Sequence, residues 1–156
     1  MRFLPTGRAV LLVALIVAHV APGPSAAAEL YCPSSAHVKP TKVPAELVQA
    51  VALAFQVDQA TVRDAAFVRC AGRKLMACYA GANLDCFRAD TRRAIPGATG
   101  WCRENPGSTG IPMAATGHAT IFEWSCEGRR AVAGKATLTA DPQGYIAENW
   151  KEITAP

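Results

Sequence analysis

Six cysteines and one histidine, His118, are the residues of this chain whose types and spacing could do chemistry. The cysteines are Cys32, Cys70, Cys78, Cys86, Cys102 and Cys126. The closest of them are eight residues apart, whereas zinc knuckles need cysteines about two to four residues apart so that one turn presents both. Thioredoxin-type and haem-attachment motifs need Cys-x-x-Cys, which is absent. The sequence therefore predicts three disulfides, with no metal site and no cofactor.

His118 lies in "TGHATIFEW", directly before a β-rich stretch. On a regular strand the eight residues to Cys126 would span about 26 Å, so the two cannot form a nucleophile pair. Glu123 is an odd number of residues away and would face the opposite side of that strand. We expect His118 to hydrogen bond at a loop–strand junction. The alternative is a catalytic role with a carboxylate from another strand.

A short phrase occurs twice, as "VRCAGRKLMA" at 68–77 and "WSCEGRRAVA" at 124–133. In both copies β-rich flanks surround a glycine, and this pattern predicts a hairpin with a tight turn. The basic residues at the two tips are most simply solvated, but two arginine-bearing tips could also grip an anion. Together with the histidine, the candidate partner-binding residues are His118, Arg73, Lys74, Arg129 and Arg130.

The first copy of the phrase predicts a strand register. If Gly72 and Arg73 form a two-residue loop, Cys70 is opposite Leu75, and its neighbours alternate between the two faces. Cys70 and Cys78 then lie on opposite faces, so we expect that they do not bond to each other.

The stretch from 94 to 117, "AIPGATGWCRENPGSTGIPMAATG", is dense in glycine and proline and predicts an ordered loop. Cys86 and Cys102 flank its beginning, so Cys86–Cys102 is the preferred bridge. The remaining four cysteines, without a Cys70–Cys78 bond, leave two connectivities open.

The rest of the chain supplies the elements that must position these residues. Helical spacing of apolar residues predicts an N-terminal helix over about 43–56, and Asp58 is placed to cap a second short one. "DPQG", residues 141–144, predicts a β-turn before a last strand. Strands then outnumber helices, which gives an α+β fold: the helices come first, and a small antiparallel sheet built from the two similar hairpins follows.

Residues 1–28 have the three parts of a secretory signal: early arginines, an apolar run and an A-x-A site. The apolar run, 9–18, is ten residues long, and a membrane span needs about 20. We therefore expect a single disulfide-rich domain at 29–156, in the periplasm or secreted, with no membrane span after signal removal. Its charge would be 14 basic minus 12 acidic residues, or +2, because Arg2 and Arg8 leave with the signal.

Four stretches together resemble a group of small exported proteobacterial proteins without an assigned activity. They are "RCAGRKLMACYAGANLDC", "WCRENPGSTGIP", "ATGHATIFEWSC" and "DPQGYIAENW". The resemblance covers nearly all of 29–156 and implies export and a shared domain, but no mechanism. In the style of its cysteine- and glycine-bearing hairpins, the chain is also distantly similar to periplasmic lysozyme inhibitors.

Neither a phosphate-binding glycine loop nor a dinucleotide fingerprint is present in the sequence. An exported protein of such mild charge rarely meets nucleic acid. The sequence favours a binding or interaction module without catalysis, whose partner is an envelope protein or an anionic envelope polymer. The alternative is a small hydrolase-like envelope enzyme that uses His118.

Overall fold

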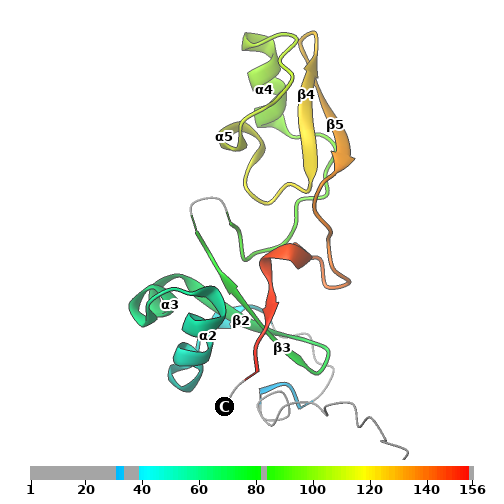
Figure 1. The fold of residues 1–156 in the computed structure, drawn as a ribbon. Helices are drawn as coiled ribbons and strands as arrows, with labels where there is room; N and C mark the ends of the chain where they lie inside the picture. Colours follow the sequence, from blue (N-terminus) through cyan, green and yellow to red (C-terminus); the bar gives the residue numbers. More distant parts are fainter. Residues whose placement is uncertain (1–30, 34–38, 82–83, 155–156) are drawn as a thin grey trace, which may run out of the picture.

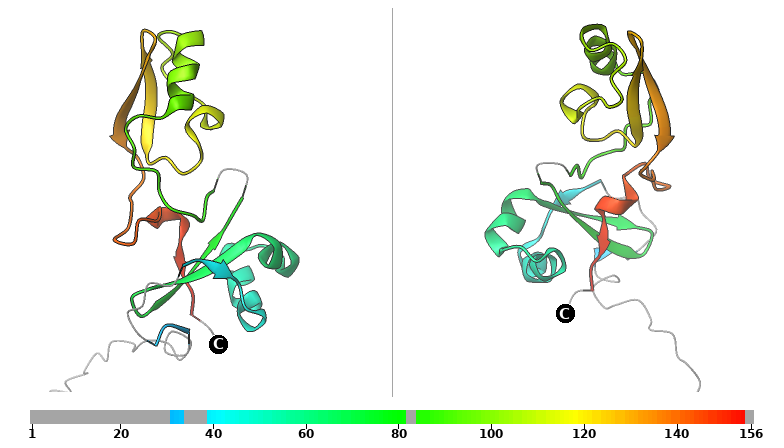
Figure 2. Two further views of the ribbon diagram at one scale, coloured as in Figure 1. Left: turned by 180° about the vertical axis from the view of Figure 1, so that it is seen from behind. Right: turned by 45° about the horizontal axis from the view of Figure 1, so that its top comes forward.

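The computed structural model describes residues 31–33, 39–81 and 84–154. The predicted signal peptide, 1–28, lies outside the described residues. The described chain combines helices with antiparallel sheets, as predicted for an α+β protein. Figures 1 and 2 show two packed units, one above the other, joined by connecting segments. No helix in the described part of the chain is long and apolar enough to cross a membrane.

The four-stranded unit contains one antiparallel sheet in the order β1-β2-β3-β6. Its strands are β1 (Thr41–Lys42), β2 (Ala66–Ala71), β3 (Lys74–Tyr79) and β6 (Lys151–Glu152). The two central strands form a hairpin, and the edge strands come from opposite ends of the described chain. Each edge strand pairs with two residues of the hairpin, so both of its edges are occupied at the middle of the sheet.

Helices cover one face of this sheet (Figure 1). They are the 3-10 helix η1 (Ala45–Leu47), α2 (Val48–Phe55) and α3 (Gln59–Ala65). Asp58 caps α3 by accepting a hydrogen bond from the Thr61 backbone N–H at 2.8 Å, which satisfies a donor that the helix leaves free. The apolar sides of the helices pack on the sheet in a core that includes Leu47, Val51, Val68, Leu75 and Ile153.

The β2–β3 hairpin turns over two residues, Gly72 and Arg73, with Gly72 at a φ of 63°. Its register pairs Cys70 with Leu75, as predicted from a two-residue loop at Gly72 and Arg73. Side chains next to each other along β2 therefore alternate between the helix-covered face and the second face of the sheet.

Connecting segments cover part of this second face. Tyr145 and Trp150, from the segment before β6, pack with Cys78 and Cys86 in a separate small core. The predicted turn at 141–144 is present, but the predicted strand does not follow it directly. The 3-10 helix η2 (Ala147–Asn149) follows instead, and β6 has only two residues.

The two-stranded unit consists of α4 (Pro96–Glu104), α5 (Met113–Thr116), β4 (Phe122–Glu127) and β5 (Arg130–Ala136). Ile95, Ala98 and Trp124 form its buried core between α4 and the strands. The stretch predicted as a loop therefore contains two helices. Pro96 occupies the first turn of α4, where its missing N–H costs no hydrogen bond.

The prediction of one sheet built from both hairpins is wrong. β4 and β5 form a sheet of their own, and both hairpins are plainly separate in Figures 1 and 2. The physical reason lies in the edges: β1 and β6 already occupy both sides of the β2–β3 hairpin. Similar turns predict similar hairpins but do not specify which strands pair.

The six cysteines form three disulfides, and each closes its own stretch of chain. The bonds are Cys32–Cys70, Cys78–Cys86 and Cys102–Cys126. Cys70 and Cys78 therefore do not bond to each other, in line with the register. The preferred Cys86–Cys102 bridge is wrong: because Cys102 lies within α4, it faces β4 rather than the connecting segment that carries Cys86.

Candidate functional site

The two basic hairpin tips lie far apart. Arg73 and Lys74 are at the tip of β2–β3, whereas Arg129 and Arg130 are at the tip of β4–β5, at opposite ends of the molecule in Figures 1 and 2. Lys74 forms an ion pair with Glu152 at 2.7 Å, and Arg130 forms one with Glu127. The structure therefore does not bring these four candidate residues together into one anion-gripping site.

His118 is exposed in the segment between α5 and β4. Within the described residues it has no hydrogen bond or ion pair, so the predicted junction hydrogen bond is not seen there. The bonded acidic partner that the hydrolase alternative requires is not present in this part of the chain: Asp90 lies beside Ala119 and Thr120, but its carboxylate pairs with Arg92. In the same described ranges, no three His, Cys, Asp or Glu side chains are grouped so as to hold a metal ion.

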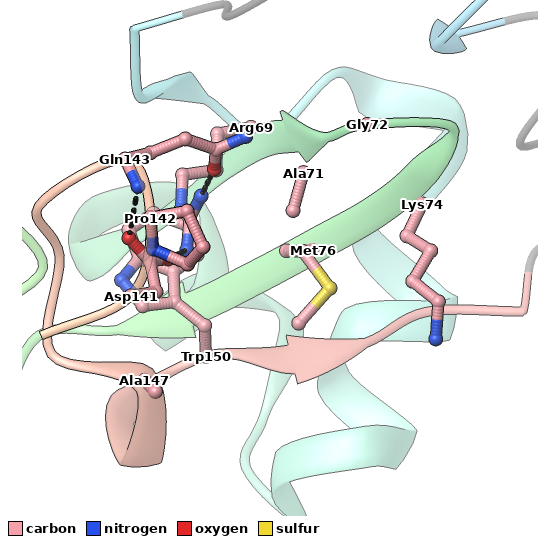
Figure 3. Close-up of a pocket in the computed structure, with 10 residues that line it drawn as sticks. All are labelled: Arg69, Ala71, Gly72, Lys74, Met76, Asp141, Pro142, Gln143, Ala147 and Trp150. Atoms are coloured by element: carbon pink, nitrogen blue, oxygen red, sulfur yellow. Dashed lines mark hydrogen bonds and ion pairs between the residues drawn. The ribbon is translucent and has the colours of Figure 1, made fainter. Parts of the chain in front are cut away.

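A pocket of about 400 Å³ opens on the second face of the four-stranded sheet, beside the part that the connecting segment covers (Figure 3). β2 and β3 supply its floor, and the 141–150 segment supplies its other walls. The lining residues are Arg69, Ala71, Gly72, Lys74, Met76, Asp141, Pro142, Gln143, Ala147 and Trp150. A concave, largely apolar site with a few polar groups is typical of ligand-binding pockets.

Arg69 is the charged residue at the centre of the site, and it is only 3% exposed. Its guanidinium donates hydrogen bonds to the Asp141 carboxylate and to Gln143 Oε1. It also lies over two aromatic rings that meet edge to face, 4.5 Å from the centroid of Tyr145 and 4.4 Å from that of Trp150. Two acceptors and two rings hold this cation in one position.

The turn sequence explains why Asp141 is available to Arg69. Its Oδ1 accepts hydrogen bonds from the backbone N–H groups of Gln143 and Tyr145, each at 2.9 Å. Gly144, at a φ of 81°, supplies the left-handed conformation and donates its N–H to the Asp141 carbonyl at 2.8 Å. Aspartate at the first position of such a turn orders the loop through one oxygen. The other oxygen, Oδ2, is left for the guanidinium.

The wall that carries Ala147 and Trp150 is fixed by Glu148. The Thr139 backbone N–H donates to both carboxylate oxygens of Glu148, at 2.9 and 3.0 Å. These hydrogen bonds hold the pKa of Glu148 below its usual range, because they favour the charged form. The segment between residues 139 and 148 is thereby closed into a loop over the sheet.

Two N–H groups of the lining residues lack an acceptor. Arg69 Nε and Trp150 Nε1 are buried and have no hydrogen-bond partner within the described structure. In the other unit Trp101 Nε1 is likewise buried without a partner among the described residues, whereas Trp124 Nε1 donates to Thr120 Oγ1 at 2.8 Å. Unpaired buried donors are uncommon, and each costs about 1–3 kcal/mol relative to a satisfied one.

Sequence reasoning missed the central residue of this site. The predicted register already placed Arg69 on the face opposite Cys70, between the apolar Phe67 and Ala71. A charged residue on an otherwise apolar strand face signals a buried cation that needs a partner. The partner, Asp141, lies 72 residues along the chain, so the strand pattern alone could not identify it.

Comparisons with protein-family models, with curated proteins and with solved structures found no match to this chain.

Proposed function

We propose that this protein is an exported binding module without catalysis, whose partner lies in the periplasm or outside the cell. In this proposal an N-terminal helical region and two similar, disulfide-stapled hairpins form the scaffold. The partner is an envelope protein or an anionic envelope polymer. The observation that carries the proposal is the pocket on the second face of the four-stranded sheet, with apolar walls around the fixed guanidinium of Arg69.

The disulfides support the location. Three disulfides in one short chain are stable in an oxidising compartment and rare in the cytosol. The proposal also needs the signal peptide to be removed. N-terminal sequencing of the full chain expressed in a Gram-negative host is expected to begin at Glu29, and an intact Met1 in a membrane fraction would contradict export.

Rigidity supports binding. The pocket floor is a hydrogen-bonded hairpin, and the wall is a turn that Asp141 and Glu148 hold in place. A preformed site loses less conformational entropy when a partner binds. By contrast, His118 is exposed and does not line the pocket. If His118 were catalytic, His118→Asn would abolish an activity without affecting folding. We expect no such loss.

Capture from a periplasmic extract tests the pocket directly. Ala71→Trp would fill the pocket from its floor, and Ala147→Trp would fill it from its wall. Ala136→Trp is the matched control, because Ala136 is exposed on the other hairpin. We expect wild type and Ala136→Trp to retain the same partner, and both pocket variants to lose it. Equal capture by all four proteins would refute the proposed function.

A further inference from the structure

The walls of the pocket show which kind of ligand it suits. Apolar groups come from both sides: Ala71 and Met76 from the hairpin, and Pro142, Ala147 and the Trp150 ring from the connecting segment (Figure 3). Contact with any of these groups is favourable for an apolar ligand, because both apolar surfaces are removed from water. Ala71 and Met76 are half-buried, so they still offer surface to a ligand.

The charged residues that line the pocket are already paired. Arg69 is paired with Asp141, and these side chains are 2% and 13% exposed. Lys74, at the rim, is paired with Glu152, and both of these are more than half exposed. Two cations and two carboxylates cancel, so an anion entering the pocket would have to compete with a carboxylate for each cation. These two ion pairs therefore do not favour an anionic ligand over a neutral one.

The unpaired N–H groups require an acceptor rather than a charge. Arg69 Nε and Trp150 Nε1 both belong to lining residues and both lack a partner among the described residues. A neutral carbonyl oxygen can satisfy such donors. Because both nitrogens are buried, an acceptor reaches them only if the Trp150 side chain shifts as the ligand enters.

We propose that the pocket binds an uncharged, apolar segment of a polypeptide. Its aliphatic side chains pack against Met76 and Pro142, and one backbone carbonyl accepts a hydrogen bond from Trp150 Nε1 or Arg69 Nε. A polypeptide is the favoured class because it carries an acceptor at every residue beside its apolar side chains. An acyl chain lacks acceptors along its length, and a polyanion lacks the apolar surface. This inference rests on the proposed function and selects the protein partner over the anionic polymer.

A titration followed by nuclear magnetic resonance tests the inference. The probes are N-acetyl-Leu-Val-Leu-amide, its acidic counterpart N-acetyl-Asp-Val-Asp-amide, inorganic polyphosphate and a lysophospholipid. The signals to follow are the Met76 methyl group and the Trp150 indole N–H. The Trp124 indole N–H is an internal control, because it is already hydrogen bonded to Thr120.

We expect the apolar peptide to shift the Met76 and Trp150 signals and to leave Trp124 in place. Its Kd should change less than about twofold between roughly 0.05 and 0.5 M salt, because exposed charges are screened over that range but apolar contacts are not. Ala71→Trp should weaken binding at least about tenfold by filling the site, whereas Ala136→Trp should not.

Three outcomes would overturn the inference. Tighter binding of the acidic peptide or polyphosphate, falling with salt, would make the ligand an anion. Shifts caused only by the lysophospholipid would make it a lipid, and no shift with any probe would exclude an apolar peptide. All three leave the proposed function standing if capture from the extract still depends on Ala71. Loss of that dependence refutes the proposed function itself.

Discussion

In the β2–β3 hairpin, Cys70 and Gly72 occupy the positions that Cys126 and Gly128 occupy in the β4–β5 hairpin. Both glycines have a left-handed backbone, with φ of 63° and 59°. Both cysteines lie on the strand face that packs against the rest of their own unit, and both are disulfide-bonded there. The repeated phrase thus produces the same turn and the same cysteine placement twice.

The hairpins differ at the residue before the cysteine. In β2 it is Arg69, which is buried beneath the connecting segment. In β4 it is Ser125, half-buried on a face where Glu123 and Lys135 form an exposed ion pair at 3.6 Å. The β2–β3 hairpin is therefore covered on both faces, and the β4–β5 hairpin on one face. Only the doubly covered hairpin carries the described pocket.

This difference shows that the local phrase and the functional surface are separate properties. Turn and register depend on residues within one hairpin, whereas burial of the second face depends on a segment more than 60 residues later, around Asp141 and Trp150. Substitutions at matched positions of the two hairpins can test this separation.

The largest difference is expected at the residue before each cysteine. Arg69→Ala leaves the mostly buried Asp141 without its cation and should lower the free energy of unfolding by about 3–5 kcal/mol. Ser125→Ala, at the matched position, should change it by less than about 0.5 kcal/mol. Urea unfolding measures both changes. In the double variant Arg69→Met with Asp141→Asn, stability should recover toward wild type, because no charge is left unpaired and the amide oxygen can still accept the two backbone hydrogen bonds of the turn. If Arg69→Ala and Ser125→Ala lowered the free energy of unfolding equally, the β2–β3 hairpin would not differ from the β4–β5 hairpin in the covering of its second face.

Removal of the disulfide should destabilise the two hairpins by similar amounts. The disulfides close loops with sequence separations of 38 residues for Cys32–Cys70 and 24 for Cys102–Cys126. In the chain-entropy model, replacing either pair by alanine should cost about 3–4 kcal/mol. Thermal unfolding of the two variants should therefore give similar losses. A neutral result for one pair would show that its hairpin is held mainly by packing.

The turn glycines should also behave alike, with a smaller effect. A Cβ added at Gly72 or Gly128 would meet nothing within 4 Å, so only the left-handed backbone resists the change. Gly72→Ala and Gly128→Ala should each lower the free energy of unfolding by about 1–2 kcal/mol. Gly100→Ala, within α4 and also unobstructed, is the control and should be neutral or stabilising by up to about 1 kcal/mol. A clear difference between the two turn variants would mean that the turns are not equivalent.

The smallest effect concerns pH and the segment that leads into the two-stranded unit. The hydrogen bond from the Arg92 side chain holds the pKa of Asp90 below its usual range. A folded-state pKa below the unfolded value means that this stabilisation is present above the unfolded pKa and is lost as pH falls through the folded one. Asp90→Asn should remove that part of the acid sensitivity, by less than about 1 kcal/mol because Arg92 is largely exposed. Unfolding curves between about pH 2 and 7 measure it. If the free energy of unfolding fell equally with pH in wild type and in the variant, the acid sensitivity would come from groups other than Asp90.

Features that depend on neighbouring residues could be predicted from the sequence alone. Alternation along β2 and β3 predicted the register that the structure has, and with it the separation of Cys70 from Cys78. Asp58 and the 141–144 turn were readable for the same reason, since caps and turns are satisfied within a few residues.

Contacts between distant segments could not be predicted in this way and are known only from the folded chain. It pairs Cys102 with Cys126 through the formation of α4, closes both edges of the β2–β3 hairpin with β1 and β6, and brings Asp141 onto Arg69. Each of these contacts joins segments whose local patterns are compatible with several partners. The choice among those partners follows from the burial of apolar surface and the pairing of buried charges over the whole chain.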